Sequence, residues 1–290
     1  MDDRVRVGLV GAGPWAEYFH APMLSRGPGT QLAGVWTRRR EAAEGLARAH
    51  GTVAFHSFDE LLDHCDAVAF SVPPQVQVEL GVAAAQRGKA ILLEKPLAAD
   101  LASAEEFASA VNRAGSTSQV MFTWRYAEQG RAALAAMPSA RVIGARGEFI
   151  LGSLLGGPFA TPWRLEGGGV LDLAPHLLDY LDAALGPITS ISGHGDRIKW
   201  AGFLIDHEGG AVSDVSISAS TPLEPMLAGV QIYTETGVVS FDANSWSTES
   251  SWSTVATEFA QTARGVPHPL DVNRGLYVQR LVERAESVLS

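Results

Sequence analysis

Cysteine is nearly absent from this chain, basic residues are outnumbered, and long apolar runs are missing. Cys65 is the only cysteine, which excludes an intramolecular disulfide and makes a cytoplasmic location the default expectation. Lysine and arginine number 22 against 32 acidic residues, and the net charge of −10 disfavours nucleic acid and anionic membrane surfaces as partners. No apolar run reaches the roughly 18 residues of a membrane span, and the first residues do not resemble a signal peptide.

The chain does contain the material of an ordinary globular protein. Its 290 residues, 46% hydrophobic and 19% charged, are enough for one large domain or two ordinary ones. Apolar runs alternate with helical patterns over about the first 120 residues. We expect strands at 5–10, 32–36, 53–55, 66–72, 90–93 and 119–122. Six strands with short crossovers predict an α/β fold with a doubly wound parallel sheet.

The pattern changes after residue 122, where turns rich in glycine, proline and serine separate one strand from the next. We expect a helix at 127–137 and strands near 141–151, 187–197, 201–206, 211–220, 228–235 and 237–242. Residues 244–253 read as a polar loop, and two helices near 252–264 and 273–288 close the chain. The second part is therefore expected to be an α+β domain with a mainly antiparallel sheet.

A glycine-rich turn, Gly11-Ala12-Gly13-Pro14-Trp15-Ala16, follows the first strand at once. It has the G-x-G-x-x-[G/A] spacing of dinucleotide-binding turns, with Ala16 in the third place. Gly11 would make the tight turn, and Gly13 would let backbone N–H groups approach a pyrophosphate at a helix N-terminus. The place of the motif between a strand and a helix favours dinucleotide binding over an ordinary glycine-rich turn.

Thr37, Arg38 and Arg39 follow the second strand, where a binder of NAD usually carries an acidic residue for the ribose hydroxyls. An acidic side chain would repel a 2′-phosphate, whereas Arg38 can bind one through paired charge-assisted hydrogen bonds. We therefore expect NADP(H) in preference to NAD(H). The alternative is that these arginines, with Arg40, are a solvated basic start to the next helix.

The four apolar residues 90–93 read as a strand buried on both faces, and the run stops abruptly at Glu94-Lys95-Pro96. Ser71 and Pro73 end the strand before it. Open α/β sheets place their chemistry at the carboxyl ends of the strands, so Lys95 is a candidate catalytic residue. A strand-end salt bridge followed by a helix-start proline is the alternative.

The second part holds another informative run, from Trp163-Arg164 through three glycines to Asp172 and His176. Pro175 is tolerated in the first turn of a helix, which predicts a helix start close to Asp172. Asp172 and His176 then lie one turn apart and face the same way. Histidine titrates near neutrality, so His176 can exchange a proton with a substrate oxygen. The alternatives are a helix cap, a locally satisfied histidine, and a metal site that lacks a third ligand.

Together these motifs resemble those of the glucose-fructose oxidoreductase / inositol dehydrogenase (Gfo/Idh/MocA-type) oxidoreductases. The resemblance covers essentially the whole chain and implies a Rossmann domain at 1–121 and a substrate-binding and dimerisation domain at 122–290. The tail helix near 274–288 is similar to one that packs back on the first domain. Lys95, Asp172 and His176 match the family's catalytic positions, and Thr37-Arg38 resembles its NADP-type phosphate clamp.

The activity implied by the resemblance is hydride transfer between NADP(H) and a carbonyl or hydroxyl carbon of a small, sugar-like substrate. His176 would be the general acid/base, Lys95 would polarise the oxygen with Glu94 keeping it placed, and Asp172 would orient His176 or bind substrate. The residues expected at the cofactor are Gly11, Gly13, Pro14, Trp15, Ala16, Thr37, Arg38, Arg39, Ser71, Pro73, Glu94 and Lys95. Those expected at the substrate are Lys95, Arg125, Trp163, Arg164, Asp172 and His176, although Arg125, Trp163 and Arg164 fit a structural role equally well. We expect a homo-oligomer, a dimer or tetramer, without a metal.

Two departures from the family pattern keep other functions open. Pro74 and Gln77 stand where many relatives carry an asparagine and a histidine, and only Leu165-Glu166 separates Arg164 from the three glycines. These changes mildly favour a protein that binds NADP(H) as a sensor or partner subunit without turnover. Reduction of an imine or an enoyl-like double bond is the alternative reaction on the same fold.

Overall fold

The computed structural model describes residues 3–137 and 141–289, and the chain divides into two units. The first unit comprises Met1–Met121 and Thr248–Tyr277, and the second comprises Phe122–Ser247 and Val278–Ser290. The chain therefore leaves the first unit after residue 121 and returns to it at residue 248. This differs from the contiguous second domain expected from residue 122, because the apolar side chains of 248–263 pack on the first sheet.

Five parallel strands form the sheet of the first unit, in the order β2-β1-β3-β4-β5. Their bounds are β1 Val5–Val10, β2 Thr30–Trp36, β3 Ala67–Phe70, β4 Ala90–Leu93 and β5 Ser118–Val120. Every residue of β3 and β4 is buried, as expected for central strands covered on both faces. The predicted doubly wound parallel sheet is confirmed.

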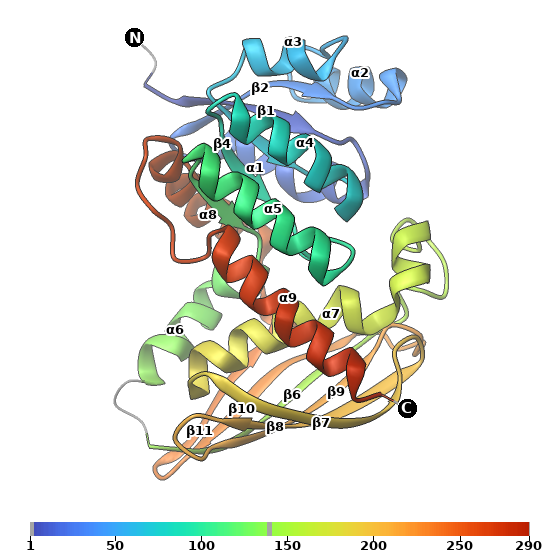
Figure 1. Cartoon of the computed structure of the whole chain (residues 1–290), viewed down its shortest axis with the longest axis vertical. Helices are drawn as coiled ribbons and strands as arrows, with labels where there is room; N and C mark the ends of the chain where they lie inside the picture. The colour runs from blue at the N-terminus through green and yellow to red at the C-terminus, as the bar shows by residue number, and fades with distance from the viewer. Residues whose placement is uncertain (1–2, 138–140, 290) are drawn as a thin grey trace. The chain divides into compact units, whose positions relative to one another are not determined.

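Helices cover both faces of this sheet (Figure 1). They are η1 Ala16–His20, α1 Ala21–Arg26, α2 Arg40–Ala49, α3 Phe58–Asp63, α4 Pro74–Gln86, α5 Leu101–Ala114, α8 Thr248–Ala263 and the start of α9, Val272–Ser287. α4 and α5 pack side by side on one face, and α1 packs with α8 on the other (Figure 1). Right-handed crossovers require this arrangement, since α1 leads towards β2 whereas α4 and α5 lead the opposite way along the sheet.

Three local predictions in the first unit need correction. Residues 53–55 form no named strand, because only Ala54 makes a single parallel bridge to Val35. The last strand is Ser118–Val120 and not 119–122. Residues 244–253 are not a loop throughout, since α8 begins at Thr248. Ser251 is fully buried in this helix, and that tertiary burial is invisible in a serine-rich sequence.

The second unit is built on a six-stranded sheet in the order β11-β10-β6-β9-β8-β7. The bounds are β6 Val142–Ile150, β7 Ile188–Asp196, β8 Trp200–His207, β9 Val212–Ser218, β10 Leu227–Thr234 and β11 Gly237–Asp242. All neighbours are antiparallel except β6 and β9, which are parallel. The helices α6 Glu128–Ala136 and α7 Pro162–Leu185 pack on one face of the sheet (Figure 1). The predicted mainly antiparallel sheet is confirmed.

α7 is broken at Gly168, whose φ of 77° and ψ of −177° are not helical. The helix resumes at once, so this start lies close to Asp172 as predicted, but Pro175 lies beyond the first turn. A Cβ at Gly168 would lie 2.6 Å from the carbonyl oxygen of Arg197, so only glycine lets the chain pass the β7–β8 connection here. The break explains why the glycine run before Asp172 needs glycine at position 168.

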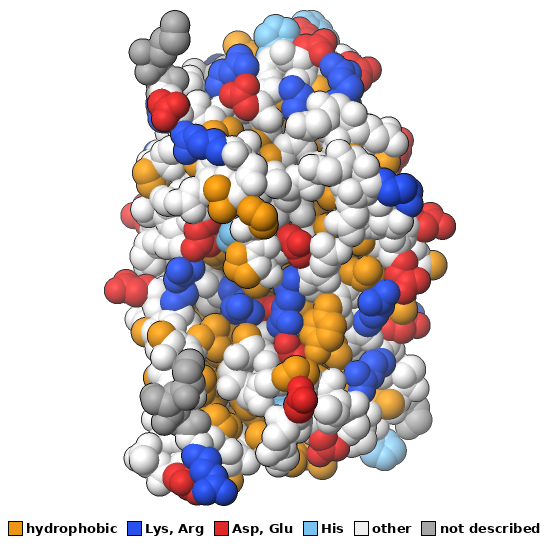
Figure 2. Space-filling model, turned by 60° about the vertical axis from the view of Figure 1, so that its left-hand side comes forward, with side chains coloured by type: hydrophobic (Ala, Val, Ile, Leu, Met, Phe, Trp, Pro, Cys, Tyr) orange, Lys and Arg blue, Asp and Glu red, His pale blue; other side chains and the backbone are white. Residues whose placement is uncertain are grey.

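The charge of the molecule is not gathered into one patch on the face drawn in Figure 2, where acidic and basic side chains are interspersed. In the described ranges 3–137 and 141–289, no helix combines the length and apolar character that crossing a membrane requires.

Candidate active site

Gly11 and Gly13 of the first turn differ in what a side chain at each position would meet. Gly11 has a φ of 116°, and a Cβ there would lie 2.1 Å from the carbonyl oxygen of Ser71, so the fold itself requires glycine. A Cβ at Gly13 would meet no described atom within 4 Å. The space beside Gly13 is therefore open from the protein side, as a backbone that receives a pyrophosphate needs. The glycine turn fits a dinucleotide on this observation.

The arginines after β2 also divide into two kinds. Arg40 forms an ion pair with Glu44 at 2.7 Å and a hydrogen bond with His56, so it belongs to the start of α2. Arg38 and Arg39 are exposed, and neither guanidinium group forms a hydrogen bond or ion pair with another described residue, although the Arg39 carbonyl oxygen accepts from Ala42 N and Ala43 N. Two guanidinium groups without a partner among the described residues thus follow β2, beside the half-buried Thr37.

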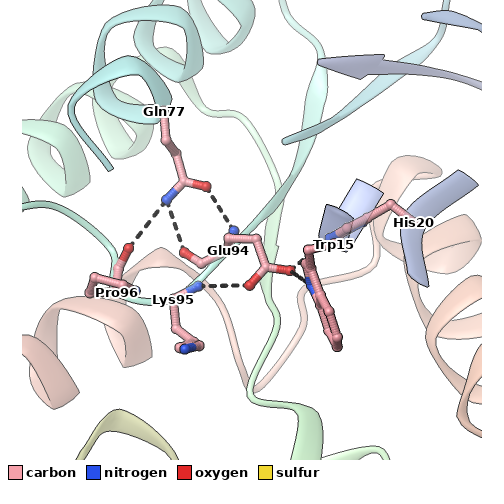
Figure 3. Close-up of polar contacts among 6 residues, drawn as sticks. All are labelled: Trp15, His20, Gln77, Glu94, Lys95 and Pro96. Atoms are coloured by element: carbon pink, nitrogen blue, oxygen red, sulfur yellow. Dashed lines mark hydrogen bonds and ion pairs between the residues drawn. The ribbon is translucent and has the colours of Figure 1, made fainter. Parts of the chain in front are cut away.

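The Glu94-Lys95-Pro96 turn follows β4 and is held by the buried side chain of Gln77 from α4 (Figure 3). Gln77 Oε1 accepts a hydrogen bond from the Glu94 backbone N at 2.7 Å. Gln77 Nε2 donates to the carbonyl oxygens of Glu94 at 2.9 Å and Leu97 at 3.1 Å. The glutamine that departs from the family pattern is therefore a structural support of the Lys95 turn, and the Lys95 side chain points away from its amide (Figure 3).

The Glu94 carboxylate joins this turn to the glycine turn (Figure 3). Its Oε1 accepts from Trp15 Nε1 at 2.7 Å and lies 2.7 Å from Nε2 of the fully buried His20. Its Oε2 accepts from the Lys95 backbone N at 3.3 Å. Glu94 thus fixes the backbone of Lys95, and it connects the ends of β1 and β4 on the carboxyl edge of the sheet.

In the second unit, α7 carries Asp172 and His176 one turn apart, and both are buried. Nδ1 of His176 lies 3.4 Å from Oγ1 of Thr123, and the imidazole stacks on Trp124 with ring centroids 5.8 Å apart. Asp172 lies inside α7 and is not its N-cap, and its Oδ2 accepts from Arg164 Nε at 3.0 Å. The structure thus supplies a packed imidazole and a carboxylate held by a cation on the same helix.

The remaining residues expected at the substrate have partners within the second unit. Arg125 donates to both carboxylate oxygens of Asp179, at 3.2 and 3.1 Å. The Arg164 guanidinium lies 4.4 Å from the ring centroid of Trp163 and 5.7 Å from that of Phe159. These contacts fit the structural reading of Arg125, Trp163 and Arg164, and they also fix where each cation lies.

Sequence reasoning missed His20, Thr123 and Trp124, and it treated Gln77 only as a departure. His20 and Gln77 act on a residue 74 and 17 positions away, respectively, so no local spacing could reveal them. Thr123 and Trp124 follow the last strand of the first sheet, and that position was their only signal. In the part of the chain that the structure describes, no group of three histidine, cysteine or acidic side chains is placed to hold a metal ion.

Comparisons with known proteins support the family resemblance and the fold. The model of an oxidoreductase family with an NAD-binding Rossmann fold, GFO_IDH_MocA, matches residues 5–122. The chain is 29% identical over 242 residues to scyllo-inositol 2-dehydrogenase (NAD(+)) of Bacillus subtilis (strain 168), covering 77% of this chain and 69% of that protein. It is 29% identical over 121 residues to glucose-6-phosphate 3-dehydrogenase of the same strain, covering 42% of this chain but only 34% of that protein.

Among solved structures, the chain has the fold of GenD2 from gentamicin A biosynthesis, which was crystallised in complex with NAD. The TM-score is 0.86 at 22% identity, and the match covers 99% of this chain and 95% of the other. The fold likeness extends over both units, whereas the family model covers the first. The resemblance expected from the motifs is confirmed, and residues 5–122 match the Gfo/Idh/MocA oxidoreductase family.

Proposed function

We propose that this protein is an NADP(H)-dependent oxidoreductase that transfers a hydride to or from a carbonyl or hydroxyl carbon of a small, sugar-like substrate. The observation that carries the proposal is the bond between Trp15 and Glu94, which ties the nucleotide-binding turn to the turn that bears Lys95. A dinucleotide held at Gly13 and an ammonium group at the same sheet edge are what hydride transfer next to a substrate oxygen requires. The sugar and inositol dehydrogenases among the relatives support the substrate class.

The cofactor preference rests on Arg38 and Arg39. Both guanidinium groups are exposed and have no partner among the described residues, although the chain has an excess of acidic residues that would pair with spare cations. A 2′-phosphate carries the charge and the oxygens that an arginine binds best. We therefore place NADP(H) ahead of NAD(H), with Thr37 and Arg38 at the phosphate.

When bound, the nicotinamide accepts or supplies the hydride. In the oxidation direction His176 takes the proton of the substrate hydroxyl, while the hydrogen on the same carbon leaves with its electron pair. Thr123 and Trp124 hold the imidazole in place, Lys95 stabilises the negative charge that develops on the oxygen, and Asp172, held by Arg164, binds substrate. Trp163 and Arg125 are further candidate substrate contacts within the second unit.

We also propose that two copies pair through the open face of the second sheet. That face carries exposed apolar side chains, among them Leu204 at 53% and Val238 at 56% exposure. It also carries Arg146 and Asp214 at paired positions of β6 and β9, so it presents both charges, as a self-complementary two-fold interface needs. Sedimentation equilibrium should show a dimer or tetramer that Leu204→Asp converts to monomer, and a monomeric wild type would contradict this.

The first experiment is calorimetric titration of the protein with NADPH and, separately, NADH. We expect the wild type to bind NADPH more tightly than NADH. Arg38→Ala should lower the affinity for NADPH about 10–100-fold, because a charge-assisted hydrogen bond is worth about 1.5–3 kcal/mol. Arg40→Ala is the matched control, since Arg40 already pairs with Glu44, and should keep wild-type affinity. Tighter binding of NADH would reject the NADP(H) preference. Binding of neither would reject the oxidoreductase, and tight binding without turnover of any carbonyl compound would favour a sensor.

A further inference from the structure

His20 is fully buried at the end of η1, and its Nε2 lies 2.7 Å from the Glu94 carboxylate. We propose that His20 and Glu94 are a positioning pair that fixes the Trp15 indole as a rigid wall for the nicotinamide half of the cofactor. The inference rests on the proposed function for the identity of the cofactor. The anchoring of the indole itself involves only this chain and can be measured on the protein alone.

The hydrogen-bond donors around Glu94 determine which ring nitrogen of His20 carries a proton. The Trp15 indole N–H and the Lys95 backbone N–H can only donate, and both are directed at the Glu94 carboxyl group. That group is therefore an acceptor on both oxygens, and His20 must carry its proton on Nε2. The same oxygen, Glu94 Oε1, is hydrogen-bonded to both the Trp15 indole and the His20 imidazole. The bond to His20 therefore holds the carboxylate in the orientation that the bond to Trp15 requires.

A histidine at position 20 buries an unpaired polar atom, which lowers the stability of the fold. Its second ring nitrogen, Nδ1, is buried without a hydrogen-bond partner among the described atoms. An apolar side chain of similar size would avoid that cost, since burying an unpaired polar atom is unfavourable. A histidine at this position is thus explained by what its Nε2 does for Glu94 and Trp15.

The helix type brings the two side chains together. η1 is a π-helix, and the N–H of Ala21 donates to the carbonyl oxygen of Ala16, five residues before it. In an α-helix, side chains five positions apart diverge by about 140°, since each residue turns about 100°. The wider π-helical turn places positions five apart near the same side, so Trp15 and His20 reach the same oxygen.

The position of the indole points to the nicotinamide half. Trp15 follows β1 and Glu94 follows β4, with β3 between them in the sheet, so the indole crosses the carboxyl edge at β3. Ligands of open α/β sheets lie outside this edge, where the strand order reverses, and here it reverses at β1 and β3. One face of the indole packs on Phe19, with centroids 5.2 Å apart and planes at 11°, and the residue remains half-exposed. The exposed part of a ring fixed on two sides is a wall for a flat ligand.

The first test is hydrogen exchange of the indole N–H groups by NMR on the cofactor-free protein, with Trp15→Phe identifying one signal among seven tryptophans. We expect Trp15 to be protected in the wild type and to exchange at least tenfold faster in His20→Phe, which keeps a ring but donates no hydrogen bond. His20→Gln supplies an amide donor and should restore part of the protection. Glu258→Ala is the matched control, because it removes another histidine–glutamate pair, the partly buried Glu258–His268 at 3.0 Å, in the same unit.

The second test is NADPH affinity by calorimetry for the same variants. We expect a three- to tenfold loss in His20→Phe and in Trp15→Phe, no loss in Glu258→Ala, and a combined loss in the double variant no larger than in either single one. Wild-type exchange and affinity in His20→Phe would overturn the inference, as would additive losses in the double variant. If His20→Phe does not fold, two Glu94 variants test the anchoring of the indole. The Trp15 signal should stay protected in Glu94→Gln and lose its protection in Glu94→Ala, and any other result would overturn the anchoring. Failure of the wild type to bind either dinucleotide would reject the proposed function while leaving the exchange result intact.

Discussion

The Gln77 side chain pairs with the backbone of Glu94 in both directions, accepting from its N–H at 2.7 Å and donating to its carbonyl oxygen at 2.9 Å. A neighbouring strand would make the same two bonds to a residue within a sheet. The amide of Gln77 thus replaces a strand at the point where β4 ends, and it pairs both backbone groups of Glu94 where the chain leaves the sheet.

Gln77→Leu should lower the free energy of unfolding by about 2 kcal/mol or more, because it leaves the buried N–H and carbonyl groups of the Lys95 turn unpaired. Gln77→Glu should also be destabilising, since a carboxylate cannot donate to the Glu94 and Leu97 carbonyl oxygens. Urea denaturation measures both. Gln86→Leu, at an exposed position of the same helix, is the control and should change stability little. If Gln77→Leu kept wild-type stability, the hydrogen bonds of Gln77 would not be what supports the Lys95 turn.

His176→Asn should lower turnover about 10²–10⁴-fold, the usual contribution of a positioned proton-transfer group. Cofactor affinity should stay near the wild-type value, because the residues proposed to bind the cofactor lie in the first unit. Thr123→Val should lower turnover about 2–10-fold, since it removes only the hydroxyl beside Nδ1. Steady-state kinetics and NADPH titration separate the two effects, and full turnover of His176→Asn would reject the acid/base role.

Alanine at the two glycines of the first turn should have opposite consequences. Gly11→Ala should destabilise the protein by about 3 kcal/mol, because its Cβ meets the Ser71 carbonyl and its φ is positive. Gly13→Ala should fold normally and bind the dinucleotide about tenfold more weakly or worse, because its Cβ enters space that only a ligand would fill. Thermal unfolding and calorimetry on the same pair of variants test this, and unchanged affinity in Gly13→Ala would count against the cofactor position.

Stability should depend on pH through His207, whose pKa burial lowers from the ordinary value although Gly186, Asp182 and Asp206 oppose the shift. As pH falls through the ordinary pKa of 6.5, the unfolded chain takes up a proton that the folded protein does not, so the unfolding free energy decreases until the lower folded pKa is reached. Denaturation at several pH values between about 8 and 5 should show this slope. His207→Gln should reduce this slope, whereas substitution of the exposed His194 should not.

Periodicity and turn residues predicted most of the fold. Four apolar residues in a row at 90–93, Asp100 accepting from the Ser103 backbone N at 2.8 Å, and Gly115 with a φ of 67° all act as their local sequence indicates. The errors lie where tertiary packing decides. Residues 53–55 look like a strand but meet only the edge of β2, and the serine-rich start of α8 is helical because Ser251 faces the core.

The site was predictable only for side chains that stand at the end of a strand or in a motif. Lys95, Gly11 and Gly13 follow from their places after β4 and β1. The supporting side chains follow from contacts across the fold, such as Trp15 with Glu94, 79 residues apart. His20 further depends on a π-helical turn, and a sequence read with an α-helical period places it on the wrong side.

The first unit is built from two separate segments of the chain, and this affects the order in which it can fold during synthesis. β5 donates the Val120 N–H to the carbonyl oxygen of Leu270, and the Ser118 hydroxyl accepts from Val272 N, so both late residues complete an early strand. The buried α8 side chains Val255 and Phe259 likewise cover a sheet that was synthesised far earlier. During translation the nucleotide-binding unit therefore stays unfinished, with one sheet face partly bare, until residue 277 has left the ribosome. A fragment ending at residue 121 should accordingly be insoluble, although it contains every expected cofactor residue.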